Sequence, residues 1–380
     1  MHLTIDASNI RRGGGVTHLE EVLKTQAYLR HGIERITIWA PQKTLDRLGD
    51  LPGLVRKSHP LIDKGRWHGV WFRKCYLDKL IEPDTDLLWA PGGTYLGNFR
   101  PYVTMLRNFL PFEKAERDRF KFSRDWVRLL YLRQAQAKSF QRADGLIHIS
   151  YKAYEVLNEI LDLRDVRQSV IHHGMSARFL MPPRPQEPFE AFSDQRPVRL
   201  LYISHINWYK HQDKLVEAVA RLRCRGIPIQ LDLVGPALPA AKKVFDPIMR
   251  KYDPNAEWVV CHGEVPYSEV QHFYQTADLY VFMSTCETFG NILLEAMASG
   301  LPILTSNRSA LPEVSGGACE EVDPEDIDAV AAGLERLIRD QSMREARAKA
   351  AYERARTFTW ERCADETFKF LADCNASYRE

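Results

Sequence analysis

The sequence predicts an α/β protein made of two doubly wound, Rossmann-like domains. Three observations predict this fold. The chain has 380 residues, which is long for a single hydrophobic core. Short apolar runs alternate with helical patterns along both halves of the chain, and this alternation is typical of parallel sheets covered by helices on both faces. A segment with five prolines, residues 181–197, interrupts the alternation and is the predicted linker.

Residues 1–180 form the predicted N-terminal domain. Helical patterns separate most of its apolar runs, and the clearest of them are Val16–Leu29 and a long pattern from Glu113 to Arg142. The predicted strands are Leu3–Ala7, Arg35–Ala40, Leu87–Ala90, Tyr102–Leu106, Gly145–Ile149 and Ser169–His172.

Residues 198–358 form the predicted C-terminal domain, and an amphipathic segment within 359–380 follows it. The predicted strands are Val198–Ser204, Ile229–Val234, Trp258–Cys261, Leu279–Met283 and Ile303–Thr305. The predicted helices are Gln212–Cys224, Lys242–Tyr252, Ser268–Gln275, Ile292–Ala298, Asp326–Arg339, Ser342–Arg356 and Trp360–Cys374. Ligands of such sheets bind beyond the carboxyl ends of the strands, so we expect the two domains to share one site in a cleft between them.

The elbow between the strand Leu279–Met283 and the helix Ile292–Ala298 is the most informative segment. Its backbone N–H groups and the positive end of the helix dipole suit a phosphate. Glu287 in the elbow and Glu295 on the helix supply carboxylates, which accept hydroxyl protons from a sugar. Together these groups indicate a sugar-nucleotide site. The alternative is an ordinary βαβ unit with two solvated glutamates.

Two other loops follow predicted strands. The first, Asn9–Val16, contains Gly13, Gly14 and Gly15 and lets the backbone approach a phosphate closely, although a flexible turn is an equal alternative. It lacks the GxGxxG spacing, so NAD binding is not expected. The second contains His205 and Lys210, and Lys210 lies where a pyrophosphate needs a cation.

These motifs resemble the signature of the family-4 retaining glycosyltransferases, which have the GT-B fold. The resemblance rests on two glutamates with seven residues between them, on Phe289-Gly290, and on the segment from Leu294 to Pro302, LEAMASGLP. The loop Tyr202–Lys210, the Gly263-Glu264-Val265 turn and Leu311-Pro312-Glu313 agree with it. The resemblance is strong from about Val198 to Ile338 and looser in the first half.

The resemblance implies a role for each matched residue. Glu295 binds the ribose hydroxyls, Glu287 contacts the transferred sugar, and Lys210 helps the backbone N–H groups of the elbow hold the pyrophosphate. It also implies that Gly263 and Val265 border the base and that Gly14 and Gly15 approach the β-phosphate from the acceptor-side domain, onto which the C-terminal helix crosses back. The elbow residues that it assigns to the nucleotide are Thr288, Phe289, Gly290 and Asn291.

The chain departs from the family pattern at two places. His205 stands where an arginine is usual, and an imidazole is only partly charged near neutrality, so we expect weaker or pH-dependent phosphate binding. Arg107-Asn108 occupies the place of a histidine near the sugar, and either side chain can hydrogen-bond the sugar or the leaving phosphate. Cations and amides suffice to stabilise a leaving group, so we still expect Glu287, Lys210, Arg107 and Asn108 to be the catalytic residues.

We therefore expect a hexosyltransferase that moves mannose, glucose or an N-acetylhexosamine from a nucleotide diphosphate sugar, with UDP or GDP as the nucleotide. The resemblance implies retention, with attack on the face that the leaving group vacates. No metal or cofactor is expected, because the amides serve the diphosphate and Asp84-Thr85-Asp86 has the context of a turn. The expected acceptor is a glycan or glycolipid of cell-surface polysaccharide or lipopolysaccharide assembly.

Composition and short motifs indicate where the protein is located in the cell and which partners it binds. The net charge is +2, and no nucleic-acid recognition motif is present, so nucleic acid is not an expected partner. The N-terminus does not read as a signal peptide, and the seven cysteines lack CxxC pairs, so we expect a cytoplasmic protein. Residues 113–142 combine nine Lys and Arg with aromatic residues, which is compatible either with the inner face of the cytoplasmic membrane or with a helix that has a solvated basic face.

Three other readings remain open. A sugar-nucleotide epimerase needs acids or bases around the hexose, and a glycosyl phosphorylase needs a pyridoxal lysine, but no motif for either is evident. A catalytically silent GT-B module that binds a glycan or a partner is supported by the departures at His205 and at Arg107-Asn108.

Overall fold

The computed structural model describes residues 1–379, and for Arg66 and Ala240 it describes the backbone. The chain divides into two compact units. The first contains Met1–Gly174 and the C-terminal segment from Phe358, and the second is Met175–Thr357. The proline-rich segment 181–197 belongs to the second unit. There it is held by Arg184, whose guanidinium donates to the carbonyl oxygens of Gln275 and Ala277 at 2.5 Å each.

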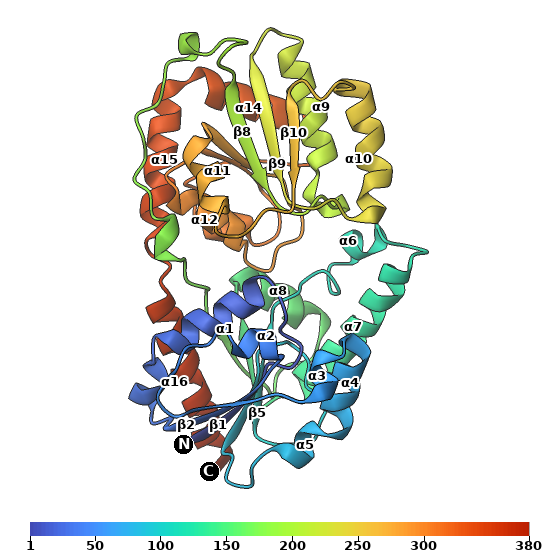
Figure 1. Cartoon of the computed structure of the whole chain (residues 1–380), viewed down its shortest axis with the longest axis vertical. Coiled ribbons are helices and arrows are strands. Elements are labelled where there is room, and N and C mark those ends of the chain that lie inside the picture. The colour runs from blue at the N-terminus through green and yellow to red at the C-terminus, as the bar shows by residue number, and fades with distance from the viewer. Residues whose placement is uncertain (380) are drawn as a thin grey trace. The chain divides into compact units, whose positions relative to one another are not determined.

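The first unit contains a seven-stranded parallel sheet with the order β3-β2-β1-β4-β5-β6-β7, of which β1, β2 and β5 are labelled in Figure 1. Its strands are β1 (His2–Asp6), β2 (Arg35–Trp39), β3 (Leu54–Lys57), β4 (Leu87–Ala90), β5 (Tyr102–Leu106), β6 (Gly145–His148) and β7 (Arg167–Val170). Strands β1 and β4 are neighbours, and the chain proceeds from them toward opposite edges. The carboxyl ends of β1 and β4 therefore mark the switch point of this sheet.

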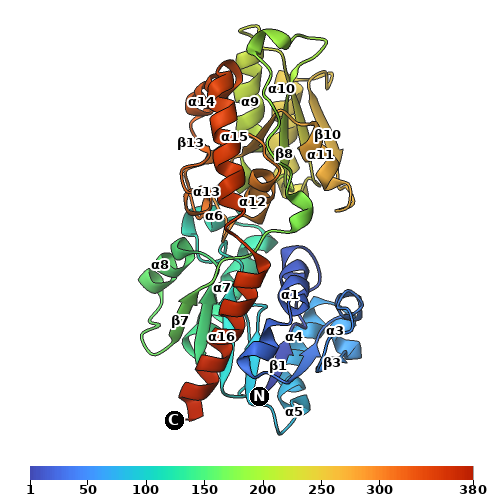
Figure 2. The ribbon, with the colours of Figure 1, turned by 90° about the vertical axis from the view of Figure 1, so that its left-hand side faces the viewer.

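The helices of the first unit connect these strands. Helix α16, the last helix of the chain, packs against α1, η1 and β4 (Figure 2). The helices are α1 (Gly14–Lys24), η1 (Ala27–His31), α2 (Gln42–Leu45), α3 (Pro60–Asp63), α4 (Arg66–Cys75), α5 (Leu77–Leu80), α6 (Lys114–Asp118), α7 (Arg124–Gln141), α8 (Tyr151–Ile160) and α16 (Trp360–Arg379).

The second unit contains a six-stranded parallel sheet with the order β10-β9-β8-β11-β12-β13. Strands β8 and β11 are neighbours at its switch point, with Leu200 opposite Leu279. The strands are β8 (Val198–Ile203), β9 (Ile229–Val234), β10 (Val259–Gly263), β11 (Leu279–Phe282), β12 (Ile303–Ser306) and β13 (Glu320–Val322).

The helices of the second unit form two groups, in which α9 packs against α10 and α14, and α12 packs against α13 and α15. The helices are η2 (Ala177–Phe179), η3 (Phe189–Ala191), η4 (Trp208–Lys210), α9 (Gln212–Arg223), α10 (Pro239–Tyr252), α11 (Val270–Thr276), α12 (Asn291–Ala298), α13 (Leu311–Ser315), α14 (Ile327–Arg339) and α15 (Gln341–Ala355).

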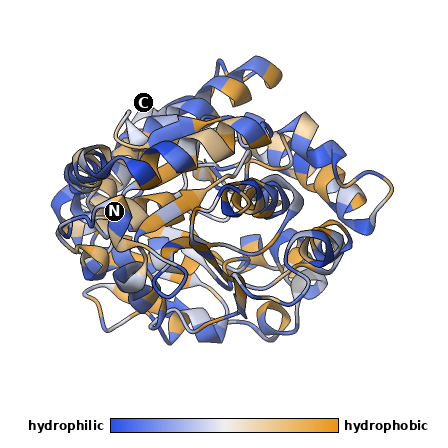
Figure 3. Ribbon diagram, turned by 90° about the horizontal axis from the view of Figure 1, so that it is seen from above, coloured by the Kyte–Doolittle hydropathy of each residue, from blue (hydrophilic) through white to orange (hydrophobic). Residues whose placement is uncertain are grey.

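Burial explains why the sheets could be predicted. The central strands β1, β4, β5, β6 and β11 are buried along their whole length, as parallel strands covered on both faces must be. The surrounding helices carry hydrophilic and hydrophobic residues side by side, which is the amphipathic pattern of helices that cover a sheet (Figure 3). The predicted α/β class with two Rossmann-like domains is confirmed.

Two predicted helices are wrong in extent. The pattern from Glu113 to Arg142 contains α6 and α7, separated at Phe122, whose φ of 63° is left-handed, and at Ser123, whose side chain accepts from the N–H of Trp126 and caps α7. The pattern Val16–Leu29 breaks at Gln26, whose φ is 54°. Strands β3 and β13 were not predicted because both lie at sheet edges and carry few apolar residues.

Candidate active site

The predicted donor residues of the second unit lie at the carboxyl ends of its two central strands. Strand β8 ends at Ile203 and leads to Lys210, whereas β11 ends at Phe282 and leads to Glu287 and α12. Since β8 and β11 are hydrogen-bonded neighbours, their two loops emerge side by side at the switch point. Open α/β sheets bind their ligands at such a point.

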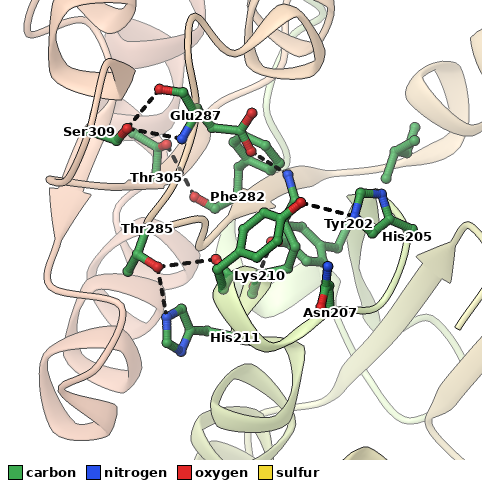
Figure 4. A network of polar contacts seen from close by, with 12 residues as sticks. Tyr202, His205, Asn207, Lys210, His211, Phe282, Thr285, Glu287, Thr305 and Ser309 are labelled. Carbon is green, nitrogen blue, oxygen red and sulfur yellow. Dashed lines mark hydrogen bonds and ion pairs between the residues drawn. The ribbon is translucent and has the colours of Figure 1, made fainter. Parts of the chain in front are cut away.

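Lys210 and Glu287 form an ion pair between these two loops (Figure 4). The side chain of Lys210 is only 4% exposed and that of Glu287 only 18%, so the pair is largely shielded from solvent. The ammonium also lies 4.8 Å from the ring centroid of Phe282. The hydroxyl of Tyr202 donates to the carbonyl oxygen of Lys210 at 2.6 Å and fixes the backbone of this residue. The lysine is therefore a positioned cation.

The backbone of the elbow is held by hydrogen bonds to two other segments. The N–H of Glu287 donates to Ser309 Oγ at 2.9 Å, and this hydroxyl donates to the carbonyl oxygen of Glu287 at 2.7 Å (Figure 4). The N–H of Thr285 donates to the carbonyl oxygen of Tyr209 at 2.9 Å, which joins the elbow to the loop that carries Lys210. Glu287 is thus fixed by two other segments of the same unit.

Gly290 makes the sharp entry into α12 possible. Its φ is 104°, and a Cβ atom at this position would lie 2.7 Å from Leu311 Cδ2. Phe289 is 2% exposed and anchors the elbow in the core, and Thr288 is buried beside it. Asn291 is the first residue of the eight-residue helix α12, so the N-terminus of α12 lies at the elbow. Such a terminus favours an anion.

Glu295 lies on α12 and accepts a hydrogen bond from the phenol of Tyr267 at 2.9 Å. Burial raises the pKa of Glu295 to about 7, while the Tyr267 hydrogen bond and the charge of Arg178 oppose that rise. Tyr267 follows the Gly263–Val265 turn, where Gly263 has a φ of 67° and Val265 is half-buried. The carboxylate of Glu295 and the predicted base-binding turn are therefore linked through Tyr267.

His205 does not carry the partial charge expected from the sequence. Burial, followed by the nearby charge of Lys210, lowers the pKa of His205 to about 4, so its imidazole is neutral near pH 7. Its Nε2 atom lies 3.2 Å from the hydroxyl oxygen of Tyr209. His205 can therefore take part in a hydrogen bond, but it does not replace the charge of an arginine.

In the first unit, the predicted glycine loop and Arg107 lie together. Gly14 and Gly15 are the first residues of α1, and Arg107 Nη1 donates to the carbonyl oxygen of Gly15 at 3.4 Å. A Cβ atom on Gly15 would lie 3.3 Å from this nitrogen, so the glycine leaves room for the guanidinium. Burial lowers the pKa of Arg107 to about 10, and the neighbouring Asn108 is exposed.

Sequence reasoning missed Tyr267 and Arg178. Both lie outside the motifs, and Arg178 belongs to η2, far from the elbow in the sequence. A tyrosine four residues after Gly263 was the only signal for Tyr267, and the contact between Arg178 and Tyr267 becomes visible only in three dimensions.

Among the described residues there is no group of three or more His, Cys, Asp or Glu side chains arranged to hold a metal ion. Asp84 pairs with Arg35 at 2.9 Å, and Asp86 accepts from the N–H of His2 at 2.7 Å, so both carboxylates have partners at the amino-terminal side of the sheet. Over the same described part of the chain, no helix is long and apolar enough to cross a membrane.

The fold is shared with solved structures over almost the whole chain. A sucrose-phosphate synthase from Thermosynechococcus elongatus has a TM-score of 0.74 at 17% identity and is matched over 99% of this chain and 100% of its own. HepE from Anabaena, solved with UDP and glucose, has a TM-score of 0.69 at 18% identity, with 98% and 100% covered. The glycosyltransferase WaaG, involved in lipopolysaccharide biosynthesis, has a TM-score of 0.67 at 16% identity. The fold is that of the GT-B glycosyltransferases.

Residues 183–354 match the family described as glycosyl transferases group 1. The O-antigen chain mannosyltransferase B of Escherichia coli is 37% identical over 110 residues, which are 29% of this chain and 29% of that protein. A glycogen synthase of Mycobacterium tuberculosis is 26% identical over 249 residues, which are 64% of this chain and 58% of that protein. The chain thus matches less than two thirds of the length of either relative.

Proposed function

We propose that the protein is a retaining glycosyltransferase that moves a hexose from a nucleotide diphosphate sugar to a glycan or glycolipid acceptor. The observation that carries the proposal is the pairing of Lys210 with Glu287 beside the Gly290 turn, at the N-terminus of α12. A cation, a carboxylate and a helix N-terminus at one switch point match the diphosphate and the hydroxyls of such a donor.

The chemistry is leaving-group stabilisation. Lys210 and the backbone N–H groups at the start of α12 stabilise the negative charge that develops on the departing diphosphate, in a site largely shielded from water. Glu287 orients the hexose through its hydroxyls, and Glu295 holds the ribose. The acceptor hydroxyl attacks the anomeric carbon on the face that the diphosphate leaves, and the leaving phosphate takes its proton. The anomeric configuration is then retained.

UDP or GDP is the proposed nucleotide, and mannose is the first hexose to test. The UDP and glucose bound to HepE support a uridine nucleotide, while the mannosyltransferases among the relatives support mannose and a role in O-antigen or other cell-surface polysaccharide. The reaction needs no metal ion in this proposal, because Lys210 and the helix N-terminus supply the positive charge.

A surface of the first unit supports contact with an anionic membrane. Aromatic side chains of α4 and α7 face the solvent, with Trp67 and Trp71 on α4 80% and 50% exposed and Tyr131 on α7 48% exposed. Phe122, between α6 and α7, is 100% exposed. The exposed cations on the same elements are Lys74, Lys121, Arg124, Arg128 and Lys138. Exposed aromatic rings among cations match an anionic lipid surface.

Vesicle flotation tests this contact. We expect binding to vesicles that contain phosphatidylglycerol and not to pure phosphatidylcholine, with less binding at high salt because the attraction is partly electrostatic. Changing Trp67, Trp71 and Phe122 to Gln should abolish the binding. Equal binding by this variant, or no binding to anionic vesicles, would remove the membrane from the proposal.

The enzymatic proposal is tested by incubating the protein with UDP- and GDP-hexoses and measuring release of the nucleoside diphosphate. We expect slow release without acceptor from one donor, and release that persists in the presence of a chelator. Proton NMR of the transferred sugar should show the anomeric configuration of the donor. Release by no donor would favour the catalytically silent binding module, and an inverted product would contradict the retaining mechanism.

A further inference from the structure

Glu295 is contacted by two side chains that lie outside the donor motifs. The phenol of Tyr267, in the loop between β10 and α11, donates to Glu295 Oε1 at 2.9 Å. The guanidinium carbon of Arg178, on η2, lies 3.5 Å from the ring centroid of Tyr267 and 4.4 Å from that of Phe179. Arg178 therefore covers the tyrosine ring that contacts the carboxylate.

This arrangement counteracts the burial of Glu295. Taking a carboxylate out of water favours its neutral form, whereas a donated hydrogen bond and a nearby cation favour the charged form. Burial is the largest influence on Glu295 and raises its pKa to about 7, while Tyr267, Arg178 and the hydroxyl of Tyr274 on α11 each lower it. Tyr280 on β11 also faces this carboxylate, and the charge of Glu295 helps to raise the pKa of Tyr280.

We infer that Tyr267 and Arg178 are positioning residues for the donor nucleotide. They keep Glu295 ionised and fix the direction of its carboxylate, and the hydrogen bond from Tyr267 to Oε1 is replaced by one from a ribose hydroxyl when the nucleotide binds. The inference rests on the proposed function, since it assigns how the ribose carboxylate of that function is prepared. Arg178 acts in two ways: its guanidinium stacks on the Tyr267 ring and restricts where the phenol points, and its charge favours the ionised form of Glu295.

The inference has a pH signature. A carboxylate accepts two ribose hydroxyls, but a protonated carboxyl group has a donor in place of one acceptor. Nucleotide affinity should therefore fall as the pH drops through about 7, where Glu295 gains a proton. Removing the phenol of Tyr267 or the charge of Arg178 raises the pKa of Glu295, so the midpoint of that fall should move to higher pH.

The experiment is calorimetric titration with UDP and with GDP between pH 5.5 and 8.5. The proteins compared are the wild type, Tyr267→Phe, Arg178→Lys, Arg178→Met and Glu295→Gln, with Tyr252→Phe on α10 as a matched control, since the hydroxyl of Tyr252 accepts from Lys251. The terminal phosphate of the ligand titrates in the same range, and the profile of Glu295→Gln, which has no carboxyl group to titrate, measures that contribution so that it can be subtracted.

We expect Tyr267→Phe to bind the nucleotide about threefold to tenfold more weakly than the wild type near pH 6.5. At pH 8.5 it should bind as tightly as the wild type, because the carboxylate is then ionised without help. Arg178→Met should shift the midpoint in the same direction, and Arg178→Lys should restore part of the shift because it keeps the charge. Tyr252→Phe should follow the wild type.

Two outcomes separate this inference from the function on which it rests. Binding that weakens equally at every pH in Tyr267→Phe, with the midpoint unmoved, would overturn the inference and leave the donor site standing, because a purely structural role weakens binding without a pH shift. Absence of nucleotide binding by the wild type at every pH would overturn the donor site and the inference together. Melting curves recorded alongside distinguish unfolding of a variant from loss of binding.

Discussion

The carboxyl edges of the two sheets differ in the partners of their charged groups. At the edge of the second unit the charged groups have partners, as Lys210 pairs with Glu287 and Glu295 accepts from Tyr267. In the first unit, within residues 1–379, the buried Oε1 atom of Gln136 and both ring nitrogens of His18 have no hydrogen-bond partner. The second edge contains an ion pair and a hydrogen-bonded carboxylate, whereas the first combines buried neutral groups with the Arg107 guanidinium, which donates to the backbone of Gly15.

This difference separates the two halves of the proposed reaction. A diphosphate has the same charge whatever the sugar, so one cation and one helix N-terminus can be prepared for it in advance. The proposed acceptor varies between glycans and is recognised through hydroxyls, for which neutral groups suffice. Four substitutions can break or sharpen this comparison, and the largest expected effect comes first.

Replacing Lys210 should have the largest effect. Lys210→Met keeps the length of the side chain but removes the cation beside Glu287, and we expect the rate of transfer to fall by about 10²–10³-fold. The measurement is initial rate at saturating donor. The matched control is Lys214→Met, since Lys214 lies on α9 and donates to the carbonyl oxygen of Glu325 at 2.9 Å. A Lys210→Met enzyme whose transfer rate lies within a few fold of the wild-type rate would show that the reaction does not depend on the charge of Lys210.

Gly290→Ala should destabilise the second unit. An alanine there must adopt a φ of 104°, and its Cβ would lie 2.7 Å from Leu311 Cδ2. We expect a loss of about 2–4 kcal/mol in the free energy of unfolding, measured with urea, from the backbone strain together with the clash.

Gly317→Ala is the control, because Gly317 has a φ of 79° and open space around its Cβ position. It should cost only about 1 kcal/mol. Equal losses in the two variants would show that contact with Leu311 does not shape the elbow.

Gln136→Leu tests one of the buried neutral groups of the first unit. Gln136 is 4% exposed and its Oε1 atom has no partner among the described residues, so we expect leucine to raise the free energy of unfolding by about 1 kcal/mol. Gln134→Leu, at an exposed position on the same helix, should leave stability unchanged. A loss of stability in Gln136→Leu would mean that the amide does find partners and that the two edges are satisfied alike.

His205→Asn should have the smallest effect near neutral pH. His205 is neutral in the folded protein down to a pKa of about 4, whereas an unfolded histidine gains its proton near the ordinary value of 6.5. The wild type should therefore lose stability as the pH falls from 6.5 toward 4, because the unfolded state binds the extra proton first. His205→Asn removes that loss, and above pH 6.5 the two melting temperatures should depend on pH alike. A charge-dependent difference at pH 7 would contradict the neutral assignment.

The sequence was sufficient for the central strands and for the donor motifs. Strands β4, β5 and β9 begin and end where they were predicted, because buried parallel strands are rich in apolar residues. Glu287, Gly290 and Glu295 lie within one short segment, so their arrangement follows from one local strand-elbow-helix unit. Their roles in binding remain predictions.

The sequence was insufficient where distant segments meet. Arg178 and Tyr267 are separated along the chain by the three strands β8, β9 and β10, and no sequence pattern indicates their contact. The break at Phe122 was missed because the sequences of α6 and α7 together form one continuous helical pattern. The neutral state of His205 depends on burial and on the Lys210 charge, neither of which a sequence displays.

The most direct test of the central claim is a thermal-shift measurement with UDP, GDP, ADP, CDP and dTDP and their sugars, on the wild type and on Glu295→Ala. A nucleotide at one hundred times its dissociation constant stabilises the fold by about 2.7 kcal/mol, which gives a clear rise in melting temperature. The account predicts that one base class raises the melting temperature of the wild type and that Glu295→Ala loses most of this rise. No shift with any nucleotide at millimolar concentration, or an undiminished shift in Glu295→Ala, would contradict it.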